Sequence, residues 1–165
     1  MRTGIFQLAE GDRTALVEHL LRLSPQDRRL RFFCPAPDSV IHKFVERVCV
    51  EQVYGFFMFD DLVATSMVMP EDEGRIEFAV SVDVEHRGCG LARQLLDHGM
   101  HTTWAEHADQ IVIRHACENL AMAALHKGLQ STQHLEAGEV DVVIDLEQMR
   151  QEQCDTMSRL MGEEL

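Results

Sequence analysis

The sequence predicts a single α/β domain built around a mixed β-sheet. Hydrophobic residues recur at helical spacing over much of the first 50 residues, and then at strand-like spacing over residues 53–84. A glycine-rich turn joins the last of these strand-like runs to an amphipathic helix. No internal repeat or low-complexity linker divides the chain, so the helices and strands are expected to share one domain.

The first third of the chain predicts one strand followed by three helices. Thr3–Leu8 is short and mostly apolar, and Asp12 is a candidate N-cap for the helix after it. Ser24–Asp27 marks the start of a second helix, because a serine cap is followed by proline at the first helical position and by an acid three residues after the cap. A third helix is expected to begin at a cap formed by Asp38 or Ser39.

The middle of the chain predicts three strands and a long helix. Val53–Phe59 and Leu62–Met69 are strand-like runs, and their junction at Asp60-Asp61 indicates a hairpin turn. Arg75–Val84 is a third strand-like run, and Gly90–His107 follows as a helix. The apolar face of this helix consists of Leu91, Leu95, Leu96, Met100 and Trp104, which are expected in the core.

The last third predicts a short strand at Ile111–Ile113, a helix at Glu118–Lys127 and a final strand at Val140–Leu146. The domain is therefore expected to span residues 1–146. Residues 147–165 are polar, acidic and contain methionines, so they are expected to form a C-terminal helix or a flexible tail. This segment could pack against a second copy of the chain in a homodimer.

The formal net charge of −13 limits the kinds of partner that the chain is expected to bind. Such an acidic protein should repel phosphate backbones, so no nucleic-acid partner is expected, whereas a cationic amine would be attracted. No apolar run approaches the roughly 20 residues of a membrane-spanning helix, so no membrane partner is expected. Met1–Glu10 lacks the apolar stretch of a secretory signal, and a cytoplasmic location is expected.

Cysteines and histidines do not form a recognisable metal site. The five cysteines are odd in number and no pair is spaced as CxxC, which predicts reduced thiols rather than disulfides or zinc ligands. His98, His101 and His107 share one predicted helix, but no carboxylate or cysteine completes an obvious ligand set. We therefore expect no metal.

The segment from Val80 to Ala92 carries the clearest chemical signal, because it runs from a strand through a glycine-rich turn into a helix. The first amides of a helix have no partners within the helix and point outward with the positive end of the helix dipole, so they attract an anion. Gly88 and Gly90 lack Cβ atoms and let a phosphate approach the backbone. Arg87 adds a fixed positive charge with forked donors.

Two other phosphate-binding loops are excluded at this turn. The glycines are not followed by Lys-Ser or Lys-Thr, so the turn is not a P-loop. Arg93 stands where the third glycine of a GxGxxG loop would be. From the spacing alone, an ordinary strand-to-helix turn remains open as the alternative.

Arg87–Ala92, with its Arg-x-x-Gly-x-Ala pattern between a strand and an amphipathic helix, resembles motif A of the GNAT N-acetyltransferase superfamily. Leu23–Phe33 and Glu77–Val80 are similar to segments of a GNAT subgroup that includes bacterial protein lysine acetyltransferases. Glu118-Asn119 is similar to the start of the motif B helix. The resemblance implies the α/β (α+β) acyl-CoA N-acyltransferase fold, with a central mixed, mostly antiparallel sheet flanked by helices.

The resemblance also implies a sheet that splays after the motif A strand and holds acetyl-CoA, as co-substrate, in the resulting V. The pantetheine arm would pair with the backbone of Val80 and Val82. Asn119 would contact the same arm, although a helix N-cap is an equal explanation for this residue. The pyrophosphate would sit on the amides of Arg87, Gly88, Cys89, Gly90, Leu91 and Ala92.

By the same resemblance, Glu77 is the general base and the N–H of Val82 polarises the thioester carbonyl. A base is required because an ammonium cannot attack a thioester. Many GNAT enzymes protonate the leaving thiolate with a motif B tyrosine, but the single tyrosine here is Tyr54, far before motif A. His126 is the candidate replacement as general acid. A surface histidine, with water protonating the thiolate, is the alternative.

The sequence therefore predicts an N-acetyltransferase that moves an acetyl group from acetyl-CoA to a primary amine by direct attack in a ternary complex. The amine could belong to a small molecule or to a protein lysine. The missing motif B tyrosine keeps open a non-catalytic acyl-CoA-binding module or sensor with the same fold. A structural protein without a ligand is the third alternative.

Overall fold

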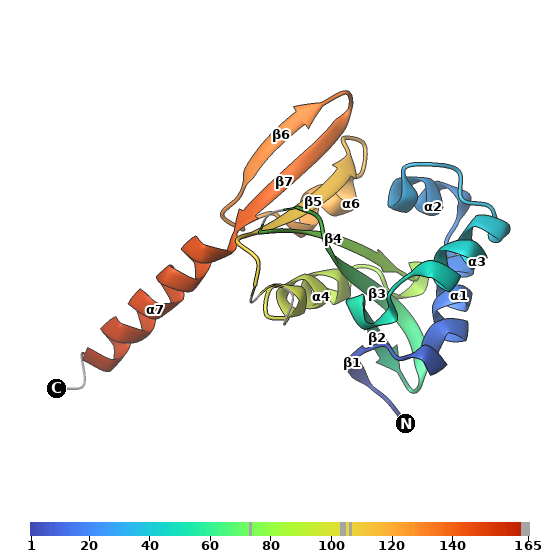
Figure 1. Cartoon of the computed structure of the whole chain (residues 1–165), viewed down its shortest axis with the longest axis horizontal. Coiled ribbons are helices and arrows are strands. Elements are labelled where there is room, and N and C mark those ends of the chain that lie inside the picture. The colour runs from blue at the N-terminus through green and yellow to red at the C-terminus, as the bar shows by residue number, and fades with distance from the viewer. Residues whose placement is uncertain (73, 103–104, 106, 163–165) are drawn as a thin grey trace.

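The computed structural model describes residues 1–72, 74–102, 105 and 107–162. Within them, seven strands form one sheet in the order β1-β2-β3-β4-β5-β7-β6 (Figure 1). The strands are β1 (Gly4–Gln7), β2 (Val53–Met58), β3 (Asp61–Pro70), β4 (Arg75–Val82), β5 (Gln110–Ala116), β6 (Thr132–Glu136) and β7 (Glu139–Asp145). Neighbouring strands are antiparallel except β4 and β5, which are parallel, so the predicted mixed, mostly antiparallel sheet is confirmed.

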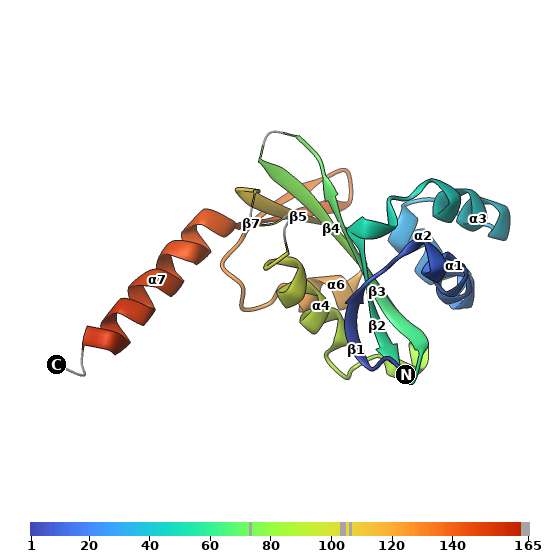
Figure 2. The same cartoon turned by 60° about the horizontal axis from the view of Figure 1, so that its bottom comes forward.

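Helices cover both faces of this sheet (Figure 1 and Figure 2). The α-helices of the described residues are α1 (Arg13–Arg22), α2 (Pro25–Phe32), α3 (Asp38–Arg47), α4 (Leu91–Gly99), α6 (Leu120–Leu125) and α7 (Leu146–Gly162), of which all but α7 lie against the sheet. The buried cluster on the α1 and α3 side includes Leu16, Leu20, Ile41, Val45 and Phe57. The cluster on the α4 and α6 side includes Phe78, Leu95, Leu96, Ile111 and Leu125. The sheet thus separates two apolar layers, as an α/β sandwich requires.

β4 presents alternate side chains to these two layers, because successive residues of a strand point to opposite faces. Phe78 belongs to the cluster beneath α4, whereas Ser81 touches His19 of α1. Glu77 has the same parity as Ser81 and therefore faces the side of α1 and α2.

β4 and β5 pair over a short length only. Residues 75–77 of β4 lie beside residues 110–112 of β5, and beyond this point the two strands no longer pair with each other. β4 nevertheless continues to Val82, and β5 continues to Ala116 along β7. The sheet therefore opens into a V after Glu77, as the resemblance implied.

α4 ends at Gly99, whereas the sequence predicted a helix that continues to His107. The Thr102 hydroxyl donates to the Gly99 carbonyl at 3.0 Å and then accepts from the N–H of Ala105 at 3.3 Å. Such local side-chain bonds compete with the helical pattern and end it. Trp104, which was expected in the core, lies outside the described residues.

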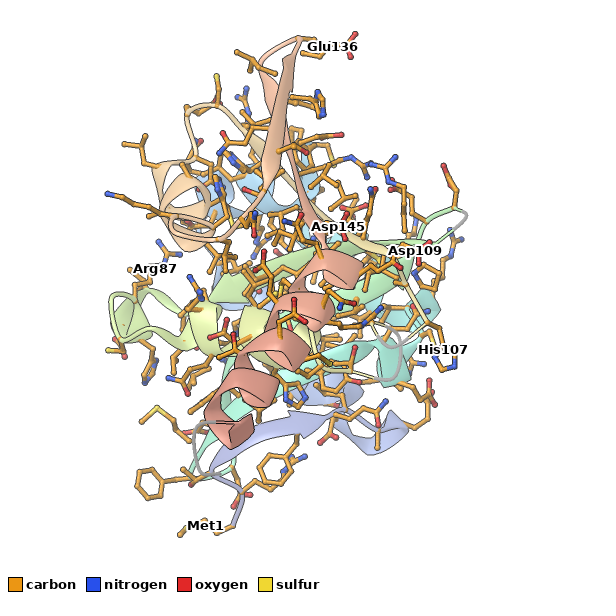
Figure 3. All side chains as sticks on the ribbon, turned by 90° about the vertical axis from the view of Figure 1, so that its left-hand side faces the viewer. Met1, Arg87, His107, Asp109, Glu136 and Asp145 are labelled. Atoms are coloured by element: carbon orange, nitrogen blue, oxygen red, sulfur yellow. The ribbon has the colours of Figure 1, made fainter. Side chains whose placement is uncertain are left out.

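β6 has no counterpart among the predicted strands. Thr132–Glu136 is exposed throughout, so it lacks the alternating apolar residues that reveal a strand with a buried face. A turn at Ala137-Gly138, with both φ angles positive, folds it onto β7 with Glu136 opposite Glu139. Figure 3 shows Glu136 at the far tip of this hairpin. The glycine of this two-residue turn is the sequence signal that could have indicated the hairpin.

Several other boundaries differ from the sequence prediction: β4 ends at Val82 rather than Val84, and α6 spans Leu120–Leu125 rather than residues 118–127. β5 runs over Gln110–Ala116 rather than Ile111–Ile113, because it pairs with β7 along its whole length. The N-cap of α3 is Pro37 rather than Asp38 or Ser39. Pro37 already has extended backbone angles, and its carbonyl accepts from Ile41 at 3.2 Å.

α7 follows β7 directly and extends away from the sheet (Figure 1). Near its start, the Arg150 guanidinium donates to the carbonyl of Ala108 at 3.0 Å. In the described part of the chain, no helix combines the length and the apolar character needed to cross a membrane.

Candidate functional site

A cleft of about 640 Å³ lies where β4 and β5 diverge. Its walls come from α2, the end of β4, the loop before α4, the first turn of α4, and α6. Most of the predicted site residues line it: Glu77, Val80, Val82, Arg87, Gly88, Gly90, Leu91, Ala92 and Asn119. Cys89 and His126 are not among the lining residues. The cleft therefore brings the predicted base and the predicted anion loop into one space.

The main chain of Val80 and Val82 faces this cleft. The N–H of Asp83 donates to the Val63 carbonyl of β3 at 2.9 Å, so the odd-numbered residues before it also bond to β3. Even-numbered residues then direct their N–H and C=O groups at the opposite edge, from which β5 has separated. The Val82 carbonyl accepts from Arg87 Nε at 3.2 Å on that edge. An extended ligand can therefore pair with β4 here.

The loop between β4 and α4 exposes main-chain amides. Gly88 and Gly90 have φ angles of +76° and +79°, a region that favours glycine. A Cβ atom at either position would meet nothing within 4 Å, so the space beside both is open. Among the described residues, no side chain caps the start of α4, which leaves its first amides for a ligand. The loop is arranged to bind an anion.

Arg87 bridges the cleft to α2. Its Nη2 atom lies 3.0 Å from Oδ2 of Asp27, and Figure 3 shows Arg87 on the loop at the edge of the molecule. Partial burial opposes the charge on Asp27, but the Arg87 guanidinium and the Ser24 hydroxyl outweigh it and hold the pKa of this carboxyl below its usual range. A diphosphate in the loop would take the place of Asp27 as the partner of Arg87.

Asp27→Asn is expected to tighten the binding of CoA about two- to five-fold, because a partly exposed ion pair is worth up to about 1 kcal/mol. Asparagine keeps an oxygen for Ser24 but removes the charge that competes with the diphosphate for Arg87. Calorimetric titration measures the Kd. Asp38→Asn, which breaks the 2.7 Å ion pair with Arg28, is the control and should leave the Kd unchanged. Equal or weaker binding by Asp27→Asn would contradict the competition.

Glu77 lies at the point where β4 and β5 part, beside Val112. Its Oε2 atom is 3.1 Å from Nη1 of Arg114. The same guanidinium also contacts Glu71 through Nη1 at 2.5 Å and Asp141 through Nε at 3.4 Å. The hydrogen bond that Arg114 donates to Glu71 raises the pKa of Arg114 against the effect of partial burial. Three carboxylates thus share one guanidinium, so this end of the cleft favours an ammonium group.

His19, Ser81 and Asp83 form a chain of polar contacts between α1 and the end of β4. His19 Nε2 is 2.8 Å from Ser81 Oγ, and His19 Nδ1 is 2.9 Å from Asp83 Oδ1. The order resembles a Ser–His–Asp relay. However, Asp83 also pairs with Arg22 at 2.8 Å, and Ser81 Oγ lies 3.0 Å from Thr65 Oγ1. With both ends held by other partners, the group braces β4 against α1.

Asn119 and His126 mark the two ends of α6. The Oδ1 atom of Asn119 accepts from the N–H of Met122 at 3.2 Å, so the side chain is an N-cap whose NH₂ group remains for a ligand in the cleft. His126 is only 6% exposed, and its ring stacks on His115 with centroids 5.5 Å apart. Burial, assisted by His115, lowers the pKa of His126. The neutral imidazole is therefore favoured.

His126→Phe is expected to leave turnover within about three-fold of the wild type and to remove part of the acid sensitivity of folding. The unfolded chain binds a proton at His126 below a pH of about 6.5, whereas the folded chain resists it, so this histidine costs stability as the pH falls. Phenylalanine keeps a ring beside His115. Melting temperatures at pH 5 and pH 8 measure the effect. A large loss of turnover would support His126 as the general acid.

The cleft also contains charged residues that the sequence did not indicate as site residues, among them Asp27, Arg31 and Arg114. The sequence indicates Asp27 only as part of a helix start, and it gives Arg31 no role within its helix. Arg114 lies beyond the short strand predicted at Ile111–Ile113. Ile111, Val112 and Ile113 are all apolar, so no alternation in the sequence indicates that the strand continues to Arg114.

The described part of the chain contains no recognisable metal-binding site. No group of three or more His, Cys, Asp or Glu side chains lies close enough together there to hold an ion. All five cysteines are exposed and free.

Comparison with protein-family models gave no match, and neither did comparison with curated protein sequences. Solved structures do match. The GNAT domain of PAT from S. lividans superposes with a TM-score of 0.72 at 18% identity, over 86% of this chain and 89% of that domain. An N-acetyltransferase from Staphylococcus aureus Mu50 gives 0.67 at 16% identity, over 88% and 99% of the two chains. YncA from Salmonella typhimurium, a putative acetyltransferase solved with acetyl-CoA, gives 0.64 at 16% identity, over 88% and 95%.

Proposed function

We propose that this chain, which has the GNAT fold, is an N-acetyltransferase that moves an acetyl group from acetyl-CoA to a primary amine. One observation carries the proposal. The cleft between β4 and β5 has an amide-lined loop beside Arg87 at one end and a carboxylate, Glu77, at the other. We also propose that residues 1–146 make up the catalytic domain and that α7 is an appendage to it.

Acetyl-CoA fits the cleft through its three parts. The pyrophosphate binds the free amides at the start of α4 and the guanidinium of Arg87. The pantetheine arm pairs with the open edge of β4 at Val80 and Val82, and the NH₂ group of Asn119 contacts it from α6. The thioester then lies toward Glu77, on the side from which the amine enters.

The reaction proposed is direct attack. Glu77 takes a proton from the bound ammonium, directly or through a water, and the free amine attacks the thioester carbonyl. The N–H of Val82 donates to the developing oxyanion. The attacking nitrogen loses its second proton to solvent and the C–S bond breaks. The CoA thiolate takes a proton from solvent, because His126 does not line the cleft.

Thiol release from acetyl-CoA, measured with a panel of primary amines, tests this function. Release that depends on the amine is the expected result. Binding of CoA without turnover on any amine would instead identify a non-catalytic acyl-CoA module. Failure of acetyl-CoA to raise the melting temperature would favour a protein without this ligand, since a ligand at 100 times its Kd stabilises by about 2.7 kcal/mol.

A further inference from the structure

Arg31 is a cation that lines the cleft within reach of the charge of Glu77. It lies on α2 and lines the cleft on the side of Glu77. Its Nη2 atom approaches Met67 Sδ at 3.3 Å, and its guanidinium carbon is 5.1 Å from the centre of the Phe32 ring. Its Nε atom is buried and has no hydrogen-bond partner. Among the described residues, no ion pair includes Arg31.

This arrangement is costly unless a ligand completes it. Burial lowers the pKa of Arg31 to about 10, with the charge of Glu77 acting in the opposite direction. Arg31 as a whole is only partly buried, but a guanidinium with a buried, unpartnered Nε gains from a paired anion, and its fork matches a carboxylate with two parallel hydrogen bonds. The other cleft arginines already have such partners: Arg87 pairs with Asp27, Arg93 with Asp97, and Arg114 with three carboxylates.

We infer that Arg31 binds a carboxylate of the acceptor, an inference that rests on the proposed function. The acceptor is then a small amino acid. Such a molecule carries its ammonium and its carboxylate a few bonds apart. The cleft offers a matching pair of charges, with Glu77 for the ammonium and Arg31 for the carboxylate. Both belong to the face of the sheet that α2 covers.

Other acceptor classes fit these charges less well. A polyamine or an aminoglycoside would bring further positive charge against the partly buried guanidinium of Arg31. A lysine side chain of a protein has no carboxylate of its own near the reacting amine. The carboxylates around Arg114 attract the ammonium of any acceptor, so they do not distinguish amino acids from the other acceptor classes. Arg31 distinguishes them, because only an amino acid brings a carboxylate.

Each amino acid is tested beside its carboxamide, which has the same side chain and amine but no carboxylate. The wild type is expected to acetylate its preferred amino acid with kcat/KM about 10- to 100-fold above that of the amide, the range of a charge-assisted pair. Arg31→Met, which fits the apolar contacts with Phe32 and Met67, should abolish this preference by raising KM for the amino acid alone. Arg31→Lys should restore part of it.

Binding of acetyl-CoA by each variant, measured by calorimetry, serves as the folding control and should match the wild type. Equal losses for amino acid and amide in Arg31→Met would overturn the inference, because they would show a structural role. Turnover of polyamines or lysine peptides without turnover of amino acids would overturn it while leaving the proposed function intact. No turnover on any amine would overturn both.

Discussion

Glu77→Gln is expected to lower kcat by about 10²- to 10⁴-fold, the usual contribution of a general base. Glutamine has the same size and can still accept a hydrogen bond from Arg114, but it cannot take a proton from the ammonium. The affinity for CoA should change by less than about two-fold, because the predicted diphosphate loop is at the other end of the cleft. Steady-state thiol release and calorimetry measure the two quantities.

Glu71→Gln is the matched control, because Glu71 contacts the same guanidinium at 2.5 Å but does not line the cleft. It should keep kcat within about three-fold of the wild type. If both variants lost turnover equally, Glu77 would act only by positioning Arg114, and its assignment as the base would be wrong.

Arg87→Glu is expected to weaken CoA binding about 30- to 150-fold, which corresponds to about 2–3 kcal/mol. The change removes a charge-assisted hydrogen bond to the diphosphate and places a negative charge beside the amides of Gly88 and Gly90. KM for acetyl-CoA should rise with the Kd, while kcat at saturating acetyl-CoA should change much less. Calorimetry and steady-state kinetics measure the effect.

Arg29→Glu makes the same change in charge on an exposed residue of α2 that does not line the cleft. It should leave the Kd for CoA unchanged within about two-fold. If the two reversals weakened binding equally, the effect would come from the net charge of the protein, and Arg87 would have no specific role.

The sequence predicted those parts of the fold that rest on local patterns. Ser24 caps α2 as expected, with its Oγ atom accepting from the N–H of Asp27 at 3.1 Å. The hairpin between β2 and β3 turns at Phe59-Asp60, one residue before the predicted junction. The loop after β4 was predictable because glycine, arginine and a helix start are adjacent in the chain.

Features that depend on distant parts of the chain were not predictable in this way. The pairing of Arg87 with Asp27, and the position of Arg31 in the wall of the cleft, arise only when α2 is placed against the end of β4. β6 is held by its backbone bonds to β7, so its polar side chains carry no strand pattern. The stacking of His126 on His115 likewise depends on how α6 meets β5, which the spacing of a helix does not reveal.

Backbone amide chemical shifts on addition of CoA, compared with those on addition of pantetheine, test the central claim that the loop before α4 binds a diphosphate through its main chain. CoA is expected to shift the amides of Gly88, Gly90 and the first turn of α4, whereas pantetheine should shift only those along the β4 edge. If CoA left the Gly88 and Gly90 amides unmoved, or if pantetheine moved them equally, the diphosphate would bind elsewhere and the claim would be contradicted.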